Sequence, residues 1–291
     1  MTTLRGQTTN RKLWVLLVIL LAIGLALLLG YKASTRWLLL LLAVIAVIVI
    51  LKRPLLGLLA LLAGALLVGH QFNTGTAVTL NVAALLLPLL LGLWFVDMVR
   101  RKDINLVPSP TYLPLILFLL ASLLSLLIGI ATWDPLIPRP TNFLLVQMAQ
   151  WAIFALSVGA FFLTANLIRS EDDLRTLTLL FLFITGAMVL LRFIPGVSST
   201  VNRHTTAAFN RAPLWALMAA LAGGQLLFNN KLKTPWRVFL LAVVGYAIYY
   251  SFYINRGSSS TWIGVGVALS ILLWLRYPRL RWLVVLVVIA T

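Results

Sequence analysis

The sequence predicts an all-α protein, a polytopic bundle of transmembrane helices with about ten complete spans and a truncated eleventh. Hydrophobic residues make up 62% of the chain and charged residues 10%, and the mean hydropathy is +1.05. Soluble domains carry charges at about a quarter of their positions. In hydrocarbon, only helices and closed β-barrels satisfy all their backbone hydrogen bonds. The apolar runs lack the two-residue alternation of barrel strands, so they are predicted to be helices. With about 20 residues per span, 291 residues leave no room for a sizeable soluble domain.

Apolar runs bounded by charged residues, Pro, Gly or Asn give the positions of the spans. They are predicted at 13–30, 37–51, 54–69, 77–98, 112–131, 143–168, 174–193, 212–229, 238–255 and 260–275, with an incomplete eleventh at 282–291. The second and third are short and are separated by Lys52 and Arg53, so a hairpin that does not fully cross the membrane is the alternative.

The chain is interpreted as one transmembrane domain over residues 1–291. Its parts are an N-terminal helical bundle (13–191), an arginine-bearing region that is expected to bind substrate (192–275), and the incomplete span (282–291).

The distribution of Lys and Arg predicts a multi-pass protein of the cytoplasmic (inner) membrane with its N-terminus in the cytoplasm. With that orientation, sixteen of the 23 cations fall on the inner side, as the positive-inside rule requires. The net charge of +17 is then explained by topology and by contacts with anionic lipids, so membrane lipids are predicted partners and nucleic acid is not. The chain has no cysteine, which excludes disulfides and thiolate catalysis, and no metal or other cofactor is predicted.

Four of the seven outer cations are arginines in the C-terminal third of the chain, namely Arg192, Arg203, Arg211 and Arg256. No acidic residue follows Asp173, so these arginines have no carboxylate partner in their own third. In a bundle of low dielectric constant this leaves them available for an anionic ligand. Arginine also holds phosphate oxygens with paired hydrogen bonds and stays charged at ordinary pH.

Two segments carry these arginines. The first, 192–215, joins two predicted spans, and the alternative to a substrate-binding role is an ordinary loop whose arginines extend to lipid headgroups. In the second, around Asn255-Arg256-Gly257, Gly257 permits a tight turn. The hydroxyl groups that follow can donate hydrogen bonds or cap the next helix; they belong to Ser258, Ser259, Ser260 and Thr261. A helix N-terminus beside an arginine favours phosphate binding. A capped turn would explain the serines but not Arg256.

Other titratable residues are weaker candidates for catalysis. His204 is a weak candidate for a general acid or base, although a polar surface residue is the commoner role for such a histidine. His70 is interpreted as a loop residue. Asp134 is interpreted as a carboxylate that pairs locally with Arg139 or is solvated, and it is a second weak candidate for a base. Asp97 precedes Arg101 by four residues, a spacing that predicts an ion pair on one helix face.

Three short motifs carry a family resemblance: Arg53-Pro54-Leu55-Leu56-Gly57, Asn210-Arg211-Ala212, and Asn255-Arg256-Gly257 followed by small residues and a tryptophan. With this arrangement the chain resembles the superfamily of O-antigen ligases and O-antigen polymerases. These are membrane glycosyltransferases that take glycans from undecaprenyl pyrophosphate at the outer face of the cytoplasmic membrane. The resemblance is specific over about 190–275 and elsewhere rests on hydropathy.

The resemblance implies a metal-independent glycosyltransferase whose partners are an undecaprenyl-pyrophosphate-linked glycan and a glycan or lipid acceptor. Arg256, Arg211, Arg203 and Arg192 would bind the pyrophosphate, with Asn255, Gly257, Ser258 and Asn210 in support. The family carries its important histidine in a large outer loop, which is expected beyond Thr291. Two other functions stay open: a transporter of anionic solutes such as bicarbonate or of lipid-linked sugars, and a non-catalytic membrane subunit of a larger complex.

Overall fold

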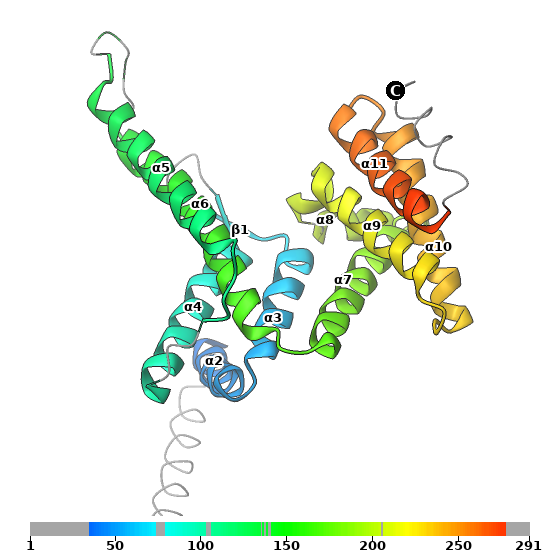
Figure 1. The fold of residues 1–291 in the computed structure, drawn as a ribbon, viewed down its shortest axis with the longest axis horizontal. Helices are drawn as coiled ribbons and strands as arrows, with labels where there is room; N and C mark the ends of the chain where they lie inside the picture. The colour runs from blue at the N-terminus through cyan, green and yellow to red at the C-terminus, as the bar shows by residue number, and fades with distance from the viewer. Residues whose placement is uncertain are drawn as a thin grey trace, which may run out of the picture. The chain divides into compact units, whose positions relative to one another are not determined.

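The structure is a computed structural model that describes residues 35–73, 79–102, 106–134, 136, 138, 141–204 and 206–277. The chain divides after Arg53 into two compact units. The described part of the first unit is helix α2 (Thr35–Lys52). All other described elements belong to the second unit, and nearly all of them are helices (Figure 1). The predicted spans at 13–30 and 282–291 lie outside the described residues.

The helices of the second unit follow one another with short connections. In chain order they are α3 (Pro54–Leu67), α4 (Val82–Arg101), α5 (Tyr112–Ala131), α6 (Phe143–Leu167), α7 (Glu171–Leu191), α8 (Ser198–His204), the 3₁₀-helix η1 (Ala207–Asn210), α9 (Ala212–Phe228), α10 (Thr234–Tyr249), the π-helix η2 (Tyr250–Ile254) and α11 (Ser259–Arg276). Within the described part, six segments are long and apolar enough to cross a membrane: α4, α5, α6, α7, α10 with η2, and α11. An all-α, multi-pass membrane fold is thus confirmed, and the number of about ten spans stays a prediction.

One local prediction was wrong, because a β-hairpin precedes α4. Strand β1 (Gln71–Asn73) pairs antiparallel with β2 (Thr79–Asn81), and the fourth span begins at Val82 rather than at 77. The Asn81 side chain accepts a hydrogen bond from the Ala84 N–H at 2.8 Å, which satisfies one free donor of the first helical turn. The β-branched and polar residues before Asn81 favour strand pairing over helix.

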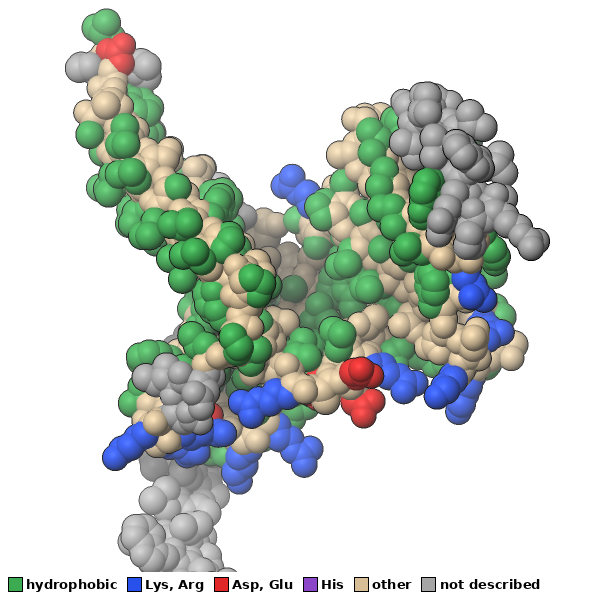
Figure 2. All heavy atoms as spheres, in the orientation of Figure 1, with side chains coloured by type: hydrophobic (Ala, Val, Ile, Leu, Met, Phe, Trp, Pro, Cys, Tyr) green, Lys and Arg blue, Asp and Glu red, His purple; other side chains and the backbone are tan. Residues whose placement is uncertain are grey.

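Charged residues at the helix ends occupy the positions that helix physics favours. Ser170 and Asp173 form a reciprocal capping box at the start of α7, where acidic side chains also complement the helix dipole. The predicted pair of Asp97 with Arg101 is confirmed at 2.9 Å, and Arg100 lies 3.5 Å from the same carboxylate. Figure 2 shows charged side chains around the first turn of α7 and the α9–α10 connection, while hydrophobic side chains cover the helix flanks.

Helices α5 and α6 form an antiparallel hairpin that hydrogen bonds join. Near the middle of the hairpin, the Trp151 indole N–H donates to the Ser122 hydroxyl at 3.2 Å. Where α5 begins and α6 ends, the buried Asn166 donates to the Tyr112 hydroxyl at 3.1 Å and accepts from the Val107 N–H at 2.9 Å. These contacts satisfy polar groups that would otherwise be exposed to lipid.

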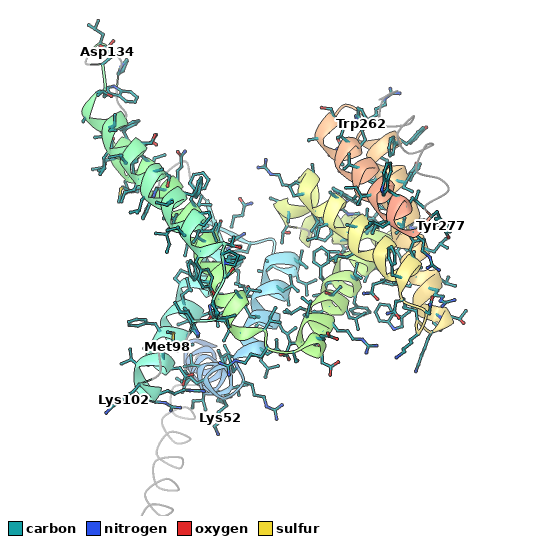
Figure 3. The ribbon with its side chains drawn as sticks, in the orientation of Figure 1. Lys52, Met98, Lys102, Asp134, Trp262 and Tyr277 are labelled. Carbon is teal, nitrogen blue, oxygen red and sulfur yellow. The ribbon has the colours of Figure 1, made fainter. Side chains whose placement is uncertain are left out.

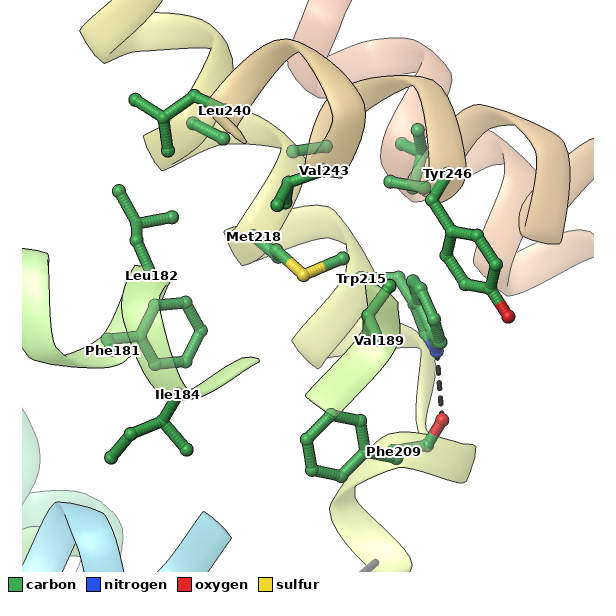
Figure 4. Packing of buried hydrophobic residues seen from close by; sticks show 14 of the residues in the cluster. Phe181, Leu182, Ile184, Val189, Phe209, Trp215, Met218, Leu240, Val243 and Tyr246 are labelled. Carbon is green, nitrogen blue, oxygen red and sulfur yellow. Dashed lines mark hydrogen bonds between the residues drawn. The ribbon is translucent and has the colours of Figure 1, made fainter. Parts of the chain in front are cut away.

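Helices α7, α9, α10 and α11 pack into the main hydrophobic core, which includes Trp215, Met218 and Val243 (Figure 4). Small residues set the distances between these helices. A methyl group on Gly264 of α11 would lie 3.2 Å from the Cβ of Ala216 on α9, and one on Gly223 of α9 would lie 3.0 Å from Leu272 on α11. The earlier residue of α9, Ala216, faces the earlier residue of α11, and the later residue, Gly223, faces the later one. The two helices are therefore parallel.

Helices α7 and α10 are also parallel to each other. Gly186 of α7 faces Val243, and Phe193, just after α7, packs edge-on against Tyr246 with ring centroids 4.7 Å apart. The chain reverses direction between α7 and α9 and again between α9 and α10, so the pair α7/α10 ends where the pair α9/α11 begins. We call this end of the four helices the arginine end, because Arg192, Arg211 and Arg256 lie there.

Candidate anion-binding site

Three of the four predicted site arginines meet at the arginine end because each lies at a helix terminus. Arg192 directly follows α7, Arg211 is the N-cap residue of α9, and Arg256 lies in the turn between η2 and α11. In Figure 3, Trp262 marks this end of α11 and Tyr277 marks the opposite end. Helix order therefore brings together residues that are up to 64 positions apart in sequence.

Arg192 is half-buried, and its guanidinium carbon lies 5.4 Å from the centre of the Phe209 ring. This distance is within the range of a cation–π interaction. The Tyr246 hydroxyl interacts with the same guanidinium through charge and hydrogen bonding. Its Nε atom is buried and has no hydrogen-bond partner within the described chain. A buried donor without a partner is costly, and an anion would satisfy it.

Aromatic residues hold Arg192 and its neighbours in place. The buried Trp215 donates its indole N–H to the Phe209 carbonyl at 2.9 Å (Figure 4). Its ring stacks on Tyr250 of η2, with centroids 4.0 Å apart and an interplanar angle of 13°. Phe209 and Tyr246, which contact Arg192, are both buried. Phe209, Trp215 and Tyr246 thus form a buried aromatic floor next to the arginine.

The π-helix η2 leads from this aromatic floor to Arg256. Its geometry places the Asn255 N–H 2.7 Å from the Tyr250 carbonyl, five residues earlier in the chain. The buried Ser251 hydroxyl in this helix has no hydrogen-bond partner among the described residues. Single π-helical turns are frequent at functional sites. Here the turn carries Tyr250 to Trp215 and leaves Arg256 exposed.

In the Arg256 turn the hydroxyl groups hydrogen-bond to one another, which is one of the two roles expected of them. Ser258 is the N-cap residue of α11, but its hydroxyl makes no capping bond to the backbone. It lies instead 3.0 Å from the Thr261 hydroxyl, to which the Asn255 amide also donates at 3.3 Å. Gly257 is not in the left-handed region, and an added methyl group would meet no atom within 4 Å, so the turn does not require glycine. The side-chain network, rather than a flexible glycine, shapes this turn.

The charges of Arg211 and Arg256 are unfavourably placed for the isolated protein. Both are exposed and lie at the N-termini of two parallel, closely packed helices. A helix N-terminus carries a partial positive charge and favours acidic side chains. No acidic residue follows Asp173 in the sequence, and neither arginine forms an ion pair with another described residue. The arrangement concentrates positive charge that a phosphate-like anion would neutralise.

The remaining predicted site residues are placed less fully. The backbone of Arg203 and His204 belongs to α8, but their side chains lie outside the described set, so both roles stay predictions. Asn210 is exposed at the end of η1, next to Arg211. His70 packs edge-on against Phe72 at 4.8 Å, which agrees with a structural role.

Asp134, at the tip of the α5–α6 hairpin in Figure 3, accepts a hydrogen bond from the Leu136 N–H at 2.9 Å. Its suggested partner Arg139 lies outside the described residues.

In the described part of the chain, no cluster of His, Asp or Glu could hold a metal ion. The aromatic floor of Phe209, Trp215 and Tyr246 was missed, because its contacts join η1, α9 and α10, and spacing along the chain does not show such contacts. Comparisons of the chain with protein-family models, with curated proteins and with solved structures find no match.

Proposed function

We propose that this protein is a membrane glycosyltransferase of the O-antigen ligase or polymerase type. It would transfer or polymerise glycan from undecaprenyl pyrophosphate at the outer face of the cytoplasmic membrane. The arginine end would bind the pyrophosphate. The observation that carries this proposal is the placement of Arg211 and Arg256 at two parallel helix N-termini without any acidic residue in that third of the chain.

The three described arginines suit a pyrophosphate in complementary ways. Arg192 interacts with Phe209 and Tyr246, and its buried Nε–H has no hydrogen-bond partner among the described residues. Arg211 and Arg256 are exposed and are free to adjust to a headgroup. Because the surrounding helices are apolar, the lipid tail would remain in the membrane while the charged group reaches the helix ends.

In the proposed reaction an acceptor hydroxyl attacks the anomeric carbon of the lipid-linked glycan. The new glycosidic C–O bond forms while the bond from that carbon to the pyrophosphate oxygen breaks, and the hydroxyl proton leaves to a base. Negative charge grows on the departing pyrophosphate in the transition state. Guanidinium groups that bind the departing pyrophosphate would lower the barrier electrostatically.

The binding step is tested with undecaprenyl pyrophosphate and the purified chain in lipid nanodiscs, with occupancy measured by native mass spectrometry. We expect Arg211→Ala and Arg256→Ala each to weaken binding about tenfold or more, since a charge-assisted hydrogen bond contributes about 1.5–3 kcal/mol. The control is Arg276→Ala, which removes an exposed arginine from the opposite end of α11. Equal affinity of wild type and both variants would refute the pyrophosphate site.

A second measurement separates the three functions. The chain is reconstituted in liposomes that contain an undecaprenyl-pyrophosphate-linked glycan and an acceptor glycan. A covalent product that depends on Arg256 supports the transferase. Movement of the labelled lipid or of bicarbonate across the bilayer without product would instead support the transporter. Stable co-purification with other membrane proteins, without lipid binding or product, would support the non-catalytic subunit.

A further inference from the structure

A second concave site lies between α5 and α6, near the tip of their hairpin. It is a pocket of about 360 Å³, within the size range of small-molecule sites. Its polar lining includes Ser122, Ser125, Gln147 and Gln150, and aromatic walls are provided by Trp133 and other rings. None of the arginines of the candidate anion site lines this pocket.

The polar side chains that line this pocket are uncharged. Among the described residues, no Lys, Arg, Asp, Glu or His lines it. Ser122 is already engaged, because it donates to the Leu119 carbonyl at 2.9 Å and accepts from the Trp151 indole. In contrast, the side chains of Gln147, Gln150 and Ser125 make no hydrogen bond to any described residue. Two amides and a hydroxyl therefore remain available to a ligand.

Unsatisfied amides are costly at this place in the molecule. Both α5 and α6 are long and apolar enough to span a membrane. Moving a hydrogen-bonding group from water into an apolar medium without a partner costs about 2–7 kcal/mol of free energy. Gln147 is half-exposed and lies one turn after the start of α6, and Gln150, nearly one turn further along the helix, is exposed on the flank of this apolar helix. These side chains therefore favour a ligand that both donates and accepts hydrogen bonds.

Aromatic rings complete the lining. Trp133 and Phe143 line the pocket at the tip of the hairpin with ring centroids 4.4 Å apart, and Trp151 and Phe154 line it further along α6. A sugar ring has one apolar face of C–H groups and a rim of hydroxyls, so it suits aromatic walls together with neutral amides. An anion would find no cation among the described lining residues, and a purely apolar lipid chain would leave the amides unsatisfied.

We propose that the α5–α6 pocket binds one or two neutral sugar rings. This proposal rests on the proposed function for the identity of its ligand as the substrate or acceptor glycan, while the site itself stands on its own residues. α7 ends at the arginine end and begins at the other end of the four helices. α6 precedes α7, so α6 finishes at that other end and starts on the side of the arginine end. The hairpin tip and the arginine end therefore lie on the same side of the membrane, as one reaction would require.

The probe is an alkyl β-glucoside with a diazirine in its sugar head, added to the purified chain in nanodiscs free of sugar-headed detergents. The matched probe has the same alkyl chain and diazirine on a phosphocholine head. We expect the glucoside to label peptides that contain 122–133 or 143–154, and the phosphocholine probe to label them at least about tenfold less. In the variant Gln147→Leu/Gln150→Leu, glucoside labelling falls about tenfold or more, because two hydrogen-bonding groups are lost.

Ser157→Ala is the matched control. Ser157 lies on α6 outside the pocket, and its hydroxyl donates to the Ile153 carbonyl at 2.8 Å. Its labelling should equal that of wild type, and so should that of Arg256→Ala, which tests the pyrophosphate site separately. Equal labelling by the two probes, or full labelling of the double glutamine variant, overturns the sugar site. Co-purification of a membrane protein that is lost only in the glutamine variant would also overturn it, in favour of a helix-docking surface.

Discussion

At the scale of single residues, the candidate anion site depends on side chains that are not themselves charged. Trp215 is buried and fastens η1 to α9 through its hydrogen bond to the Phe209 carbonyl. Phe209 in turn lies beneath the guanidinium of Arg192. The position of Arg192 is therefore determined by an indole N–H two contacts away. This explains why an arginine can be half-buried here without a carboxylate.

This dependence makes Trp215→Phe a sharp test. Phenylalanine keeps most of the ring stacking on Tyr250 but leaves the buried Phe209 carbonyl without its donor. We expect a loss of about 1–3 kcal/mol in the free energy of unfolding, measured by denaturant titration in mixed micelles. Trp262→Phe, at a half-buried ring on α11, is the control and should change stability less. Equal stability of the two variants would show that the indole hydrogen bond is dispensable.

At the scale of helices, glycine decides how closely the spans approach. An added methyl group at Gly186 of α7 would lie 2.6 Å from Phe239 and 2.7 Å from Val243 of α10. At Gly264 it would lie 3.2 Å from Ala216, so α9 and α11 also approach closely. Such contacts allow dispersion forces and backbone proximity to hold helices together where lipid offers no hydrophobic driving force. They also determine that the N-termini of α9 and α11 lie together.

Two glycine-to-alanine variants test this interpretation. Gly186→Ala should destabilise the protein by about 1–3 kcal/mol, because Phe239 and Val243 must move to make room. Gly245→Ala, on α10 with no atom within 4 Å of an added methyl group, should be neutral or gain about 0.5–1 kcal/mol from helix propensity. Thermal unfolding in detergent measures both. A Gly186→Ala protein as stable as Gly245→Ala would refute close packing of α7 on α10.

At the scale of the whole molecule, basic residues separate by helix end. The end of the four helices opposite the arginine end carries Arg175, Lys231, Lys233, Arg237 and Arg276. The acidic residues Glu171, Asp172 and Asp173 lie at that opposite end as well. The arginine end has cations without acidic residues. The two ends of these helices therefore differ in chemistry, and the positive-inside rule predicts that the end opposite the arginine end faces the cytoplasm.

Because the chain has no cysteine, single introduced thiols report this orientation directly. Ala207→Cys lies exposed in η1 at the arginine end, and Asn230→Cys lies exposed in the α9–α10 connection. In intact cells a membrane-impermeant maleimide should label Ala207→Cys, whereas Asn230→Cys should react only after permeabilisation. The cysteine-free chain is the control for background labelling. The reverse pattern would place the arginine end in the cytoplasm and contradict the proposed function.

Sequence patterns predicted the helices well where one physical rule dominates. The fifth span was expected at 112–131 and α5 occupies Tyr112–Ala131, since uninterrupted apolar residues leave helix as the structure that satisfies its backbone. The fourth span was displaced by the β-hairpin and by capping at Asn81, both local hydrogen-bonding effects that hydropathy does not register. Similarly, α8 and η1 were missed in a segment that was expected to be a loop.

The sequence by itself determined that the chain is suited to a lipid environment, that it is helical, and that the arginines after Asp173 lack acidic partners in their own third of the chain. These properties follow from composition and from the order of charged residues. Tertiary structure alone decided that α9 runs parallel to α11, so that Arg211 and Arg256 share one end, and that Phe209 lies under Arg192. It also decided that Gln147 and Gln150 line one pocket with Trp133. These contacts depend on side-chain packing between segments that are distant in sequence. Hydropathy and residue spacing do not show such packing.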